Sequence, residues 1–141
     1  MPTADPPDDL LAAALAARGR TYSPYSGYAV GAALRDEHGR IHAATNVENA
    51  AYPQGQCAEA SAIGMLIAAG GRRIVEALVV ADPAAGLPTP CGACRQRLRE
   101  FMRLDGLVHL AGLDGVIRSV TLGELLPLSF GPEFLLRETP R

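Results

Sequence analysis

The strongest strand signal in the chain is the apolar run at residues 74–81 (IVEALVVA), which stands between two segments with helical patterns. Residues 58–69 before it are mostly small and aliphatic, which predicts a helix buried on most sides. Residues 92–102 after it place their large apolar side chains on one side of a second helix. Alternation of helix and strand is typical of α/β proteins, in which helices pack on a sheet.

The remaining segments extend the same pattern. Asp8 or Asp9 can cap a first helix, and Gly19 would end it. We therefore predict an α/β fold, a three-layer α/β/α sandwich with a mixed central sheet of about five strands. The other predicted strands lie near residues 28–34, 40–45, 107–111 and 116–120, and a short helix is expected at 121–126.

Length and composition limit the chain to one domain. It has 141 residues, of which 48% are hydrophobic, so it can bury a sizeable core. We expect flexible tails at residues 1–7 and 137–141 and a single domain at 8–136. The net charge of −2 gives no general attraction to nucleic acid or to anionic lipid. No apolar stretch is long enough to span a membrane and no signal peptide is apparent, so we expect a cytoplasmic protein.

Three cysteines carry the clearest chemical signal. Cys57 precedes the first predicted buried helix, and Cys91 and Cys94 open the second within the sequence Pro-Cys-Gly-Ala-Cys. An odd number of cysteines argues against a closed disulfide framework. Helix starts favour thiolates, and three thiolates at two adjacent helix starts would suit a thiophilic ion, usually zinc. No fourth cysteine exists, and none of the three histidines stands beside a cysteine, although a histidine ligand is a minor alternative. One tetrahedral position would then be open, as in catalytic zinc sites.

Glu59 is the candidate proton carrier of this centre. It lies two residues after Cys57, in the first turn of the predicted helix, where it could reach the open position without binding the metal. The alternative is a carboxylate that only complements the helix dipole. The nearby thiolates favour the catalytic interpretation, because hydrolysis at an open zinc site needs a proton shuttle.

The pattern Cys-Ala-Glu followed by Pro-Cys-Gly-Ala-Cys resembles the signature by which zinc nucleoside and base deaminases are generally recognised. Further segments, from about residue 21 to residue 134, are similar to those of the cytidine deaminase family. These segments are SPYS at 23–26, VGAA at 30–33, NVENA at 46–50, CRQ at 94–96, ELLP at 124–127 and SFGP at 129–132.

The resemblance implies roles for residues outside the metal centre. Asn46 and Glu48 would bind the ribose hydroxyls, and Ala58 would also contact substrate. Tyr28 would pack near the sugar and base, although a strand residue that fills the core is an equal alternative. Phe130 would cover the pyrimidine of a neighbouring subunit, because similar short deaminases are commonly homotetramers.

The activity that the resemblance implies is hydrolytic deamination of cytidine, and of deoxycytidine, in pyrimidine salvage. One Zn²⁺ per subunit would supply a bound hydroxide that attacks C4 of the base. Glu59 would carry one proton to N3 and a second to the departing amino group.

One position departs from the family pattern. Many three-cysteine relatives have an arginine after Cys-Ala-Glu, whereas this chain has Ala60. Three thiolates around one Zn²⁺ leave a net negative charge, which makes a bound water harder to ionise. Arg95, next to Cys94, is the residue that we expect to offset this charge, unless it is only part of an exposed arginine stripe.

Four other functions remain to be weighed. The Cys-Gly-Ala-Cys spacing also occurs in dithiol oxidoreductases, but that function leaves Cys57 and Glu59 without a role. A structural zinc module would need a closed site. A deaminase that edits nucleic acid would need a basic channel, which the acidic composition disfavours. A deaminase of another small aminopyrimidine nucleoside, such as a nucleoside antibiotic, is the nearest alternative.

Overall fold

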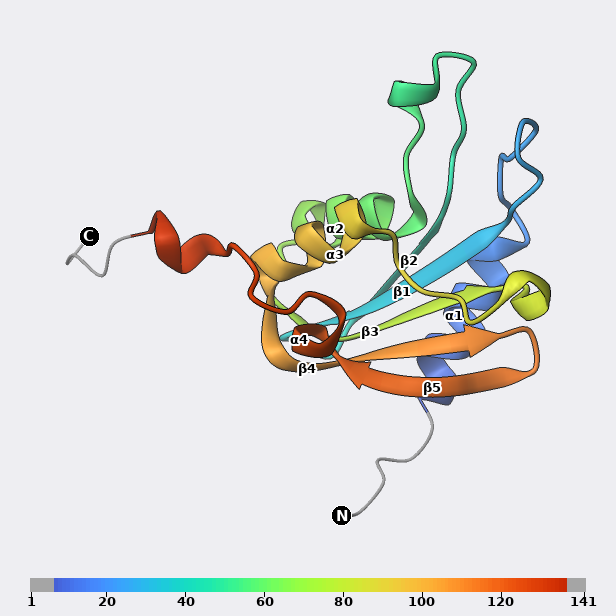
Figure 1. Cartoon of the computed structure of the whole chain (residues 1–141). Helices are drawn as coiled ribbons and strands as arrows, with labels where there is room; N and C mark the ends of the chain where they lie inside the picture. Colours follow the sequence, from blue (N-terminus) through green and yellow to red (C-terminus); the bar gives the residue numbers. More distant parts are fainter. Residues whose placement is uncertain (1–6, 137–141) are drawn as a thin grey trace.

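The computed structural model describes residues 7–136, and within them five strands and four α-helices alternate along the chain (Figure 1). None of these helices is long and apolar enough to cross a membrane. The predicted tail at 137–141, and residues 1–6 of the predicted tail at 1–7, lie outside the described part. The elements are α1 (Asp8–Arg18), β1 (Val30–Asp36), β2 (Ile41–Thr45), α2 (Ala58–Ala68), β3 (Ile74–Ala81), α3 (Gly92–Phe101), β4 (Met102–Gly112), β5 (Gly115–Thr121) and α4 (Leu122–Leu125), with 3-10 turns at Tyr52–Gln54, Pro83–Ala85 and Pro132–Phe134.

The five strands form one mixed sheet in the order β2-β1-β3-β4-β5. β3 and β4 are parallel, whereas the other neighbouring pairs are antiparallel. A parallel pair needs a crossover connection, and α3 provides it between β3 and β4. β1 starts, and β2 and β3 finish, at one end of the sheet, because Val30 pairs with Ala81 and Gly31 pairs with Thr45. The loops that lead to α2 and α3 therefore both leave from this end.

The sheet has helices on both faces, as predicted. Figure 1 shows α1 on one face, and α2 and α3 on the other. Leu78 and Val80 of β3 pack with Leu10 and Ala14 of α1, and all four are fully buried. Each leucine buried in this way contributes about 1.5–3 kcal/mol. The opposite cluster joins α2, α3 and α4 to the other side of the strands, and its buried members are Leu34, Ala62, Ile63, Leu66, Ile74, Ala77, Leu98, Met102, Val108, Leu110, Val120 and Leu122.

Two local expectations, for the cap of α1 and for the start of β4, were wrong. α1 begins after Pro7, with no side-chain cap, so Asp8 and Asp9 stand in its first turn rather than at its N-cap. There the two carboxylates interact favourably with the positive end of the helix dipole. α2 is buried or half-buried along most of its surface, as expected, and its exposed residues are Gly64, Met65 and Ala68, with Met65 49% exposed. β4 begins at Met102, directly after α3, and is longer than expected.

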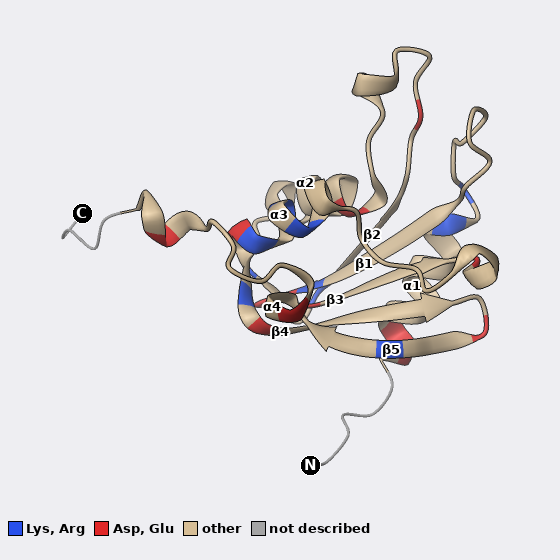
Figure 2. Cartoon of the chain, in the orientation of Figure 1, with Lys and Arg blue, Asp and Glu red and all other residues tan. Residues whose placement is uncertain are grey.

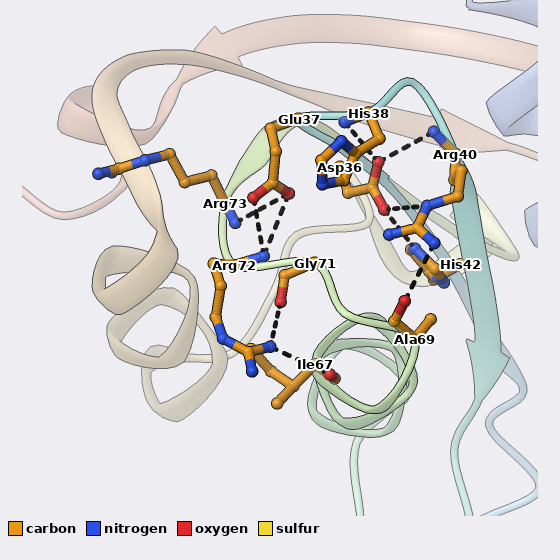
Figure 3. A network of polar contacts seen from close by, with 10 residues as sticks. All are labelled: Asp36, Glu37, His38, Arg40, His42, Ile67, Ala69, Gly71, Arg72 and Arg73. Atoms are coloured by element: carbon orange, nitrogen blue, oxygen red, sulfur yellow. Dashed lines mark hydrogen bonds and ion pairs between the residues drawn. The ribbon is translucent and has the colours of Figure 1, made fainter.

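A buried carboxylate organises the hairpin between β1 and β2 (Figure 3). Asp36 is 1% exposed and accepts hydrogen bonds from the backbone N–H groups of His38 and Arg40, at 2.8 and 3.0 Å. Its Oδ2 also lies 3.0 Å from Arg40 Nε and 2.8 Å from His42 Nε2. Burial alone would raise the pKa of Asp36, but the bonds from His42 and the two amides outweigh it and hold the pKa well below its ordinary value.

The same hairpin binds the end of α2 (Figure 3). Arg40 Nη1 donates to the carbonyl oxygen of Ala69 at 3.0 Å. The Glu37 carboxylate accepts hydrogen bonds from the backbone N–H groups of Arg72 and Arg73, just before β3. These contacts fix the C-terminal end of α2 against the sheet, and therefore limit where its first residues can lie.

We predict that Asp36→Asn lowers the thermal unfolding temperature at neutral pH by several degrees. A carboxyl group whose folded pKa is depressed contributes stability above its unfolded pKa and loses it as pH falls. The difference between the variant and the native protein should therefore shrink as pH falls from about 5 to about 2. Melting curves followed by circular dichroism test this, with Asp114→Asn in an exposed turn as the control. Equal melting temperatures at neutral pH would contradict it.

Candidate metal and active site

The three cysteines meet at the starts of α2 and α3. Cys57 is the N-cap residue of α2, Cys91 is the N-cap residue of α3, and Cys94 lies in the first turn of α3. All three sulfur atoms lie within 4.8 Å of one another, and the Cys57 and Cys91 sulfurs are 3.9 Å apart. None of the three is in a disulfide. α2 and α3 pack side by side on one face of the sheet, which brings the two helix starts together (Figure 1).

This geometry fits a zinc ion. Zinc binds cysteine sulfur at about 2.3 Å, so two sulfurs of a tetrahedral site are about 3.8 Å apart. The distance between the sulfurs of Cys57 and Cys91, 3.9 Å, is close to that value, and free backbone N–H groups at both helix starts favour negative charge there. Burial raises the pKa values of Cys57 and Cys94. Partial burial would also raise the pKa of Cys91, but the hydrogen bond from the backbone N–H of Cys94 helps to lower it below the ordinary value.

Glu59 lies beside the sulfurs in the first turn of α2 and is 3% exposed. Burial raises the pKa of its carboxyl group above the ordinary value, while contact with Cys94 and the charge of Arg97 act in the opposite direction. A raised pKa brings a carboxyl group nearer to neutral pH, where it can both accept and release a proton. The position suits the proton carrier that the sequence predicted.

A cleft of about 300 Å³ opens onto this centre. Its size is at the lower end of the range for small-molecule sites. It lies at the carboxyl end of β3, where Val79 and Ala81 form part of its wall. Seven predicted residues line it, and they are Tyr28, Asn46, Glu48, Cys57, Ala58, Glu59 and Cys91.

Asn46 and Glu48 enter the cleft from the loop between β2 and α2, which pairs with the loop before β1. Figure 1 shows both loops projecting from the same end of the sheet. The backbones join where Tyr22 bridges Val47. Asn46 Nδ2 donates to the Tyr28 carbonyl at 2.8 Å, and its Oδ1 accepts from the Val30 N–H at 3.0 Å. Asn46 therefore sets the path of the chain into β1.

The Glu48 carboxylate holds the neighbouring turn. Its Oε1 accepts hydrogen bonds from the backbone N–H groups of Tyr25 and Ser26, at 2.9 and 3.1 Å. Its Oε2 accepts a short hydrogen bond from the Ser26 hydroxyl. The bond from this hydroxyl lowers the pKa of Glu48, so the group stays ionised. The sequence did not reveal these scaffold bonds, because they join residues more than twenty positions apart.

Two aromatic residues have different surroundings. Tyr28 lines the cleft and is 46% exposed, so the alternative that it fills the core is wrong. Phe130 does not line this cleft, is 55% exposed and stacks on Phe134 with ring centres 4.9 Å apart. Gln96 Nε2 of α3 donates to the Phe130 carbonyl at 2.8 Å and ties this segment to the helix.

The segment that carries Phe130 is also clamped by a buried arginine. Arg99 is 7% exposed, and its Nε donates to the Ser129 hydroxyl at 2.8 Å. Its Nη2 donates to both carboxylate oxygens of Glu133, at 2.9 and 2.7 Å. A bidentate pair of this kind fixes geometry as well as charge. α3 thus positions both the two cysteines and the C-terminal segment.

Basic residues occur along α3, where the ribbon is blue in Figure 2, and two of its arginines make different contacts. Arg95 Nε and Nη1 each donate to a backbone carbonyl, those of Pro90 and Leu125, at 2.8 Å. Its predicted role in charge compensation stays a prediction. Arg97 Nη1 lies 3.6 Å from the Cys94 sulfur, a contact that the sequence analysis missed. The spacing of three residues from Cys94, which places both side chains on one helix face, could have indicated it.

Comparisons with known proteins agree with this site. Residues 6–109 match the family model described as the cytidine and deoxycytidylate deaminase zinc-binding region. The chain is 42% identical to cytidine deaminase from Halalkalibacterium halodurans, over 88% of this chain and 93% of the relative. It is 40% identical to cytidine deaminase from Mycobacterium tuberculosis, over 83% of this chain and 84% of the relative.

Solved structures show the same fold. The crystal structure of cytidine deaminase from Burkholderia pseudomallei superposes with a TM-score of 0.81 at 40% identity, and the match covers 87% of this chain and 98% of that one. The Mycobacterium tuberculosis enzyme superposes with a TM-score of 0.76 at 36% identity, over 88% and 96% of the two chains. The chain therefore belongs to the zinc-dependent cytidine and deoxycytidylate deaminase family.

We predict that Cys57→Ser, Cys91→Ser and Cys94→Ser each lose zinc. A residue outside the coordination sphere typically changes metal affinity by about 10–100-fold, and loss of a thiolate ligand should cost more. Metal analysis after dialysis against a chelator measures this. Ala93→Ser, in the exposed position between the two cysteines of α3, is the matched control and should retain the metal. Full zinc retention by any cysteine variant would remove that residue from the ligand set.

Proposed function

We propose that this protein hydrolyses the 4-amino group of cytidine, and of deoxycytidine, to give the uridine nucleoside and ammonia. The observation that carries the proposal is the position of Glu59, buried in one small cleft beside three convergent cysteine sulfurs. Such a reaction belongs to cytoplasmic pyrimidine salvage.

Cys57, Cys91 and Cys94 would hold one zinc ion at the base of the cleft. When bound, the ion acts as a Lewis acid that lowers the pKa of a water molecule towards neutrality. Glu59 would take a proton from that water and deliver it to N3 of the pyrimidine, which makes C4 more electrophilic. Glu59 would then carry the second proton of the water to the amino group. The water oxygen forms a bond to C4 and the C4–N bond breaks. Ammonia leaves with the two hydrogens of the amino group and this second proton, while the first proton stays on N3.

Asn46 and Glu48, which also line the cleft, would bind the ribose hydroxyls. Glu48 stays ionised, so it can accept a hydrogen bond from a hydroxyl, and one N–H of Asn46 is available beyond its bond to Tyr28. Because both side chains also hold the surrounding loops, the sugar would meet groups that are already oriented. Ala58 and Tyr28 would contact the base and sugar from the remaining sides.

A free nucleoside suits this cleft better than a polymer. A single-stranded nucleic acid needs a positively charged groove along its backbone. The chain carries a net charge of −2, and Glu48 and Glu59 both face the cleft. The size of the cleft and its acidic lining therefore favour an uncharged small molecule.

We predict that the zinc-loaded protein deaminates cytidine and deoxycytidine, and deaminates free cytosine poorly because cytosine lacks the sugar. Loss of the cytidine ultraviolet absorbance measures the rate. Glu59→Gln, the control with the same shape, should keep zinc and lose at least about 100-fold in rate, because a positioned acid–base group typically contributes about 10²–10⁴-fold.

Inactivity towards both nucleosides in zinc-loaded protein would contradict the proposal, and turnover of a different aminopyrimidine nucleoside would then assign the substrate. Substantial activity in Glu59→Gln would remove Glu59 from the proton-carrying role.

We further propose that the protein is a homotetramer in which neighbouring chains cover the clefts. All four tyrosines lie on loops at the cleft end of the sheet and are between 46% and 75% exposed. The outer face of α2 exposes Met65 together with Gly64 and Ala68, although it carries no charged residue. An apolar face of this kind, next to a site, marks an interaction surface, and a second copy of the chain is the occupant that we propose. Phe130 would then reach the pyrimidine in another subunit.

We predict that Met65→Glu dissociates the oligomer, because each copy of the symmetric interface would bury a charge. Size-exclusion chromatography with light scattering measures the mass. Leu113→Glu, which alters an exposed leucine in the turn between β4 and β5, is the control and should leave the mass unchanged. A native protein with the mass of one chain would contradict the oligomer.

A further inference from the structure

Arg97 is the one arginine of α3 whose guanidinium contacts a cysteine sulfur in the described part of the chain. Its Nη1 lies 3.6 Å from the Sγ of Cys94. Cys94 is fully buried, so solvent screens a charge on its sulfur very little. Arg97 itself is exposed, which lets the charged group keep part of its hydration while it contacts the sulfur.

Arg95 is less suited to the same task. Its guanidinium donates to the carbonyl oxygens of Pro90 and Leu125, both at 2.8 Å, and so joins the loop before α3 to the end of α4. Turning that group towards the sulfurs would leave both carbonyls without these partners, and breaking these two hydrogen bonds costs free energy. Its place next to Cys94 in the sequence therefore does not translate into contact with the thiolates.

The small side chain of Ala60 leaves space beside Arg97 at the surface between α2 and α3. Ala60 of α2 and Arg97 of α3 line the same surface depression between the two helices. The side chain of Ala60 is a single methyl group, and a longer side chain there would project into the space beside Arg97. The position at which the Cys-Ala-Glu-Arg pattern has an arginine, here Ala60, thus lies beside Arg97 of the neighbouring helix.

We propose that Arg97 supplies, from α3, the positive charge that many three-cysteine relatives place directly after their Cys-Ala-Glu motif, at the position of Ala60 in α2. The inference rests on the proposed function, since it concerns the charge of the three-thiolate centre. Three thiolates and one divalent ion leave a net negative charge, and a guanidinium on the Cys94 sulfur stabilises that state. Arg97 is a positioning residue, because it acts on the centre through Cys94 and does not line the substrate cleft.

The test compares four variants of the full-length protein. Arg97→Gln removes the charge, Arg97→Lys keeps it, and the double variant Ala60→Arg/Arg97→Gln returns an arginine to α2. Arg103→Gln removes an exposed arginine just beyond the far end of α3, where it pairs with Asp105, and is the control. Zinc affinity is measured by competition with a chromogenic chelator, and kcat and KM for cytidine are measured in parallel.

We expect Arg97→Gln to lose about 10–100-fold in zinc affinity, which is typical of residues that support metal ligands from outside the coordination sphere. Its kcat should fall while KM stays unchanged, because the cleft residues are intact. Arg97→Lys should keep most of the affinity, the double variant should recover it, and Arg103→Gln should match the native protein.

Native zinc affinity in Arg97→Gln would overturn the inference, as would an equal loss in Arg97→Gln and Arg97→Lys without recovery in the double variant. A native protein that binds zinc but does not deaminate cytidine would instead count against the proposed function. The melting temperature of each metal-free variant shows whether it is folded, and Arg97→Lys serves as the informative variant if Arg97→Gln is not.

Discussion

Convergence of three sulfur atoms at two helix starts is the constraint on which the rest of the structure depends. Cys57 comes from one helix and the other two cysteines from the next, yet all three sulfurs lie within 4.8 Å. The parallel pairing of β3 with β4 sends α3 across the same face as α2, and the hairpin contacts to residues 69–73 fix the far end of α2. The apolar cluster between these helices and the sheet therefore sets the geometry of a polar site.

The cleft depends on a second set of contacts, which join two loops. Asn46 and Glu48 bind the backbone of residues 25–30, so the groups proposed to meet the sugar also build the wall in which they stand. Such dual use limits rearrangement of the loops when a ligand enters. It also means that substitution of either residue changes both binding and local order.

α3 links the metal centre to the surface of the molecule. Its first turn carries two cysteines, Arg97 contacts one of them, and Gln96 and Arg99 hold the segment with Phe130. One helix thus positions groups for its own cleft and, in the proposed oligomer, for a neighbouring one. Changes at the oligomer interface would then reach the metal centre through a short, rigid element rather than through a flexible loop.

The sequence by itself determined the α/β fold, the cysteine trio and Glu59, because helix starts and short motif spacings are local properties. It also indicated the three-layer arrangement, since the order of elements restricts how helices can cover one sheet. Only the tertiary structure decided which arginine contacts a sulfur. Arg95 is nearer to Cys94 in sequence, but its guanidinium donates to two backbone carbonyls. Arg97 lies about one helical turn after Cys94, and its guanidinium contacts the Cys94 sulfur. The contacts of a long side chain depend on hydrogen-bond partners and free space that residues distant in the sequence provide. These partners come together only when the chain has folded, as do the partners of Asn46 and Glu48.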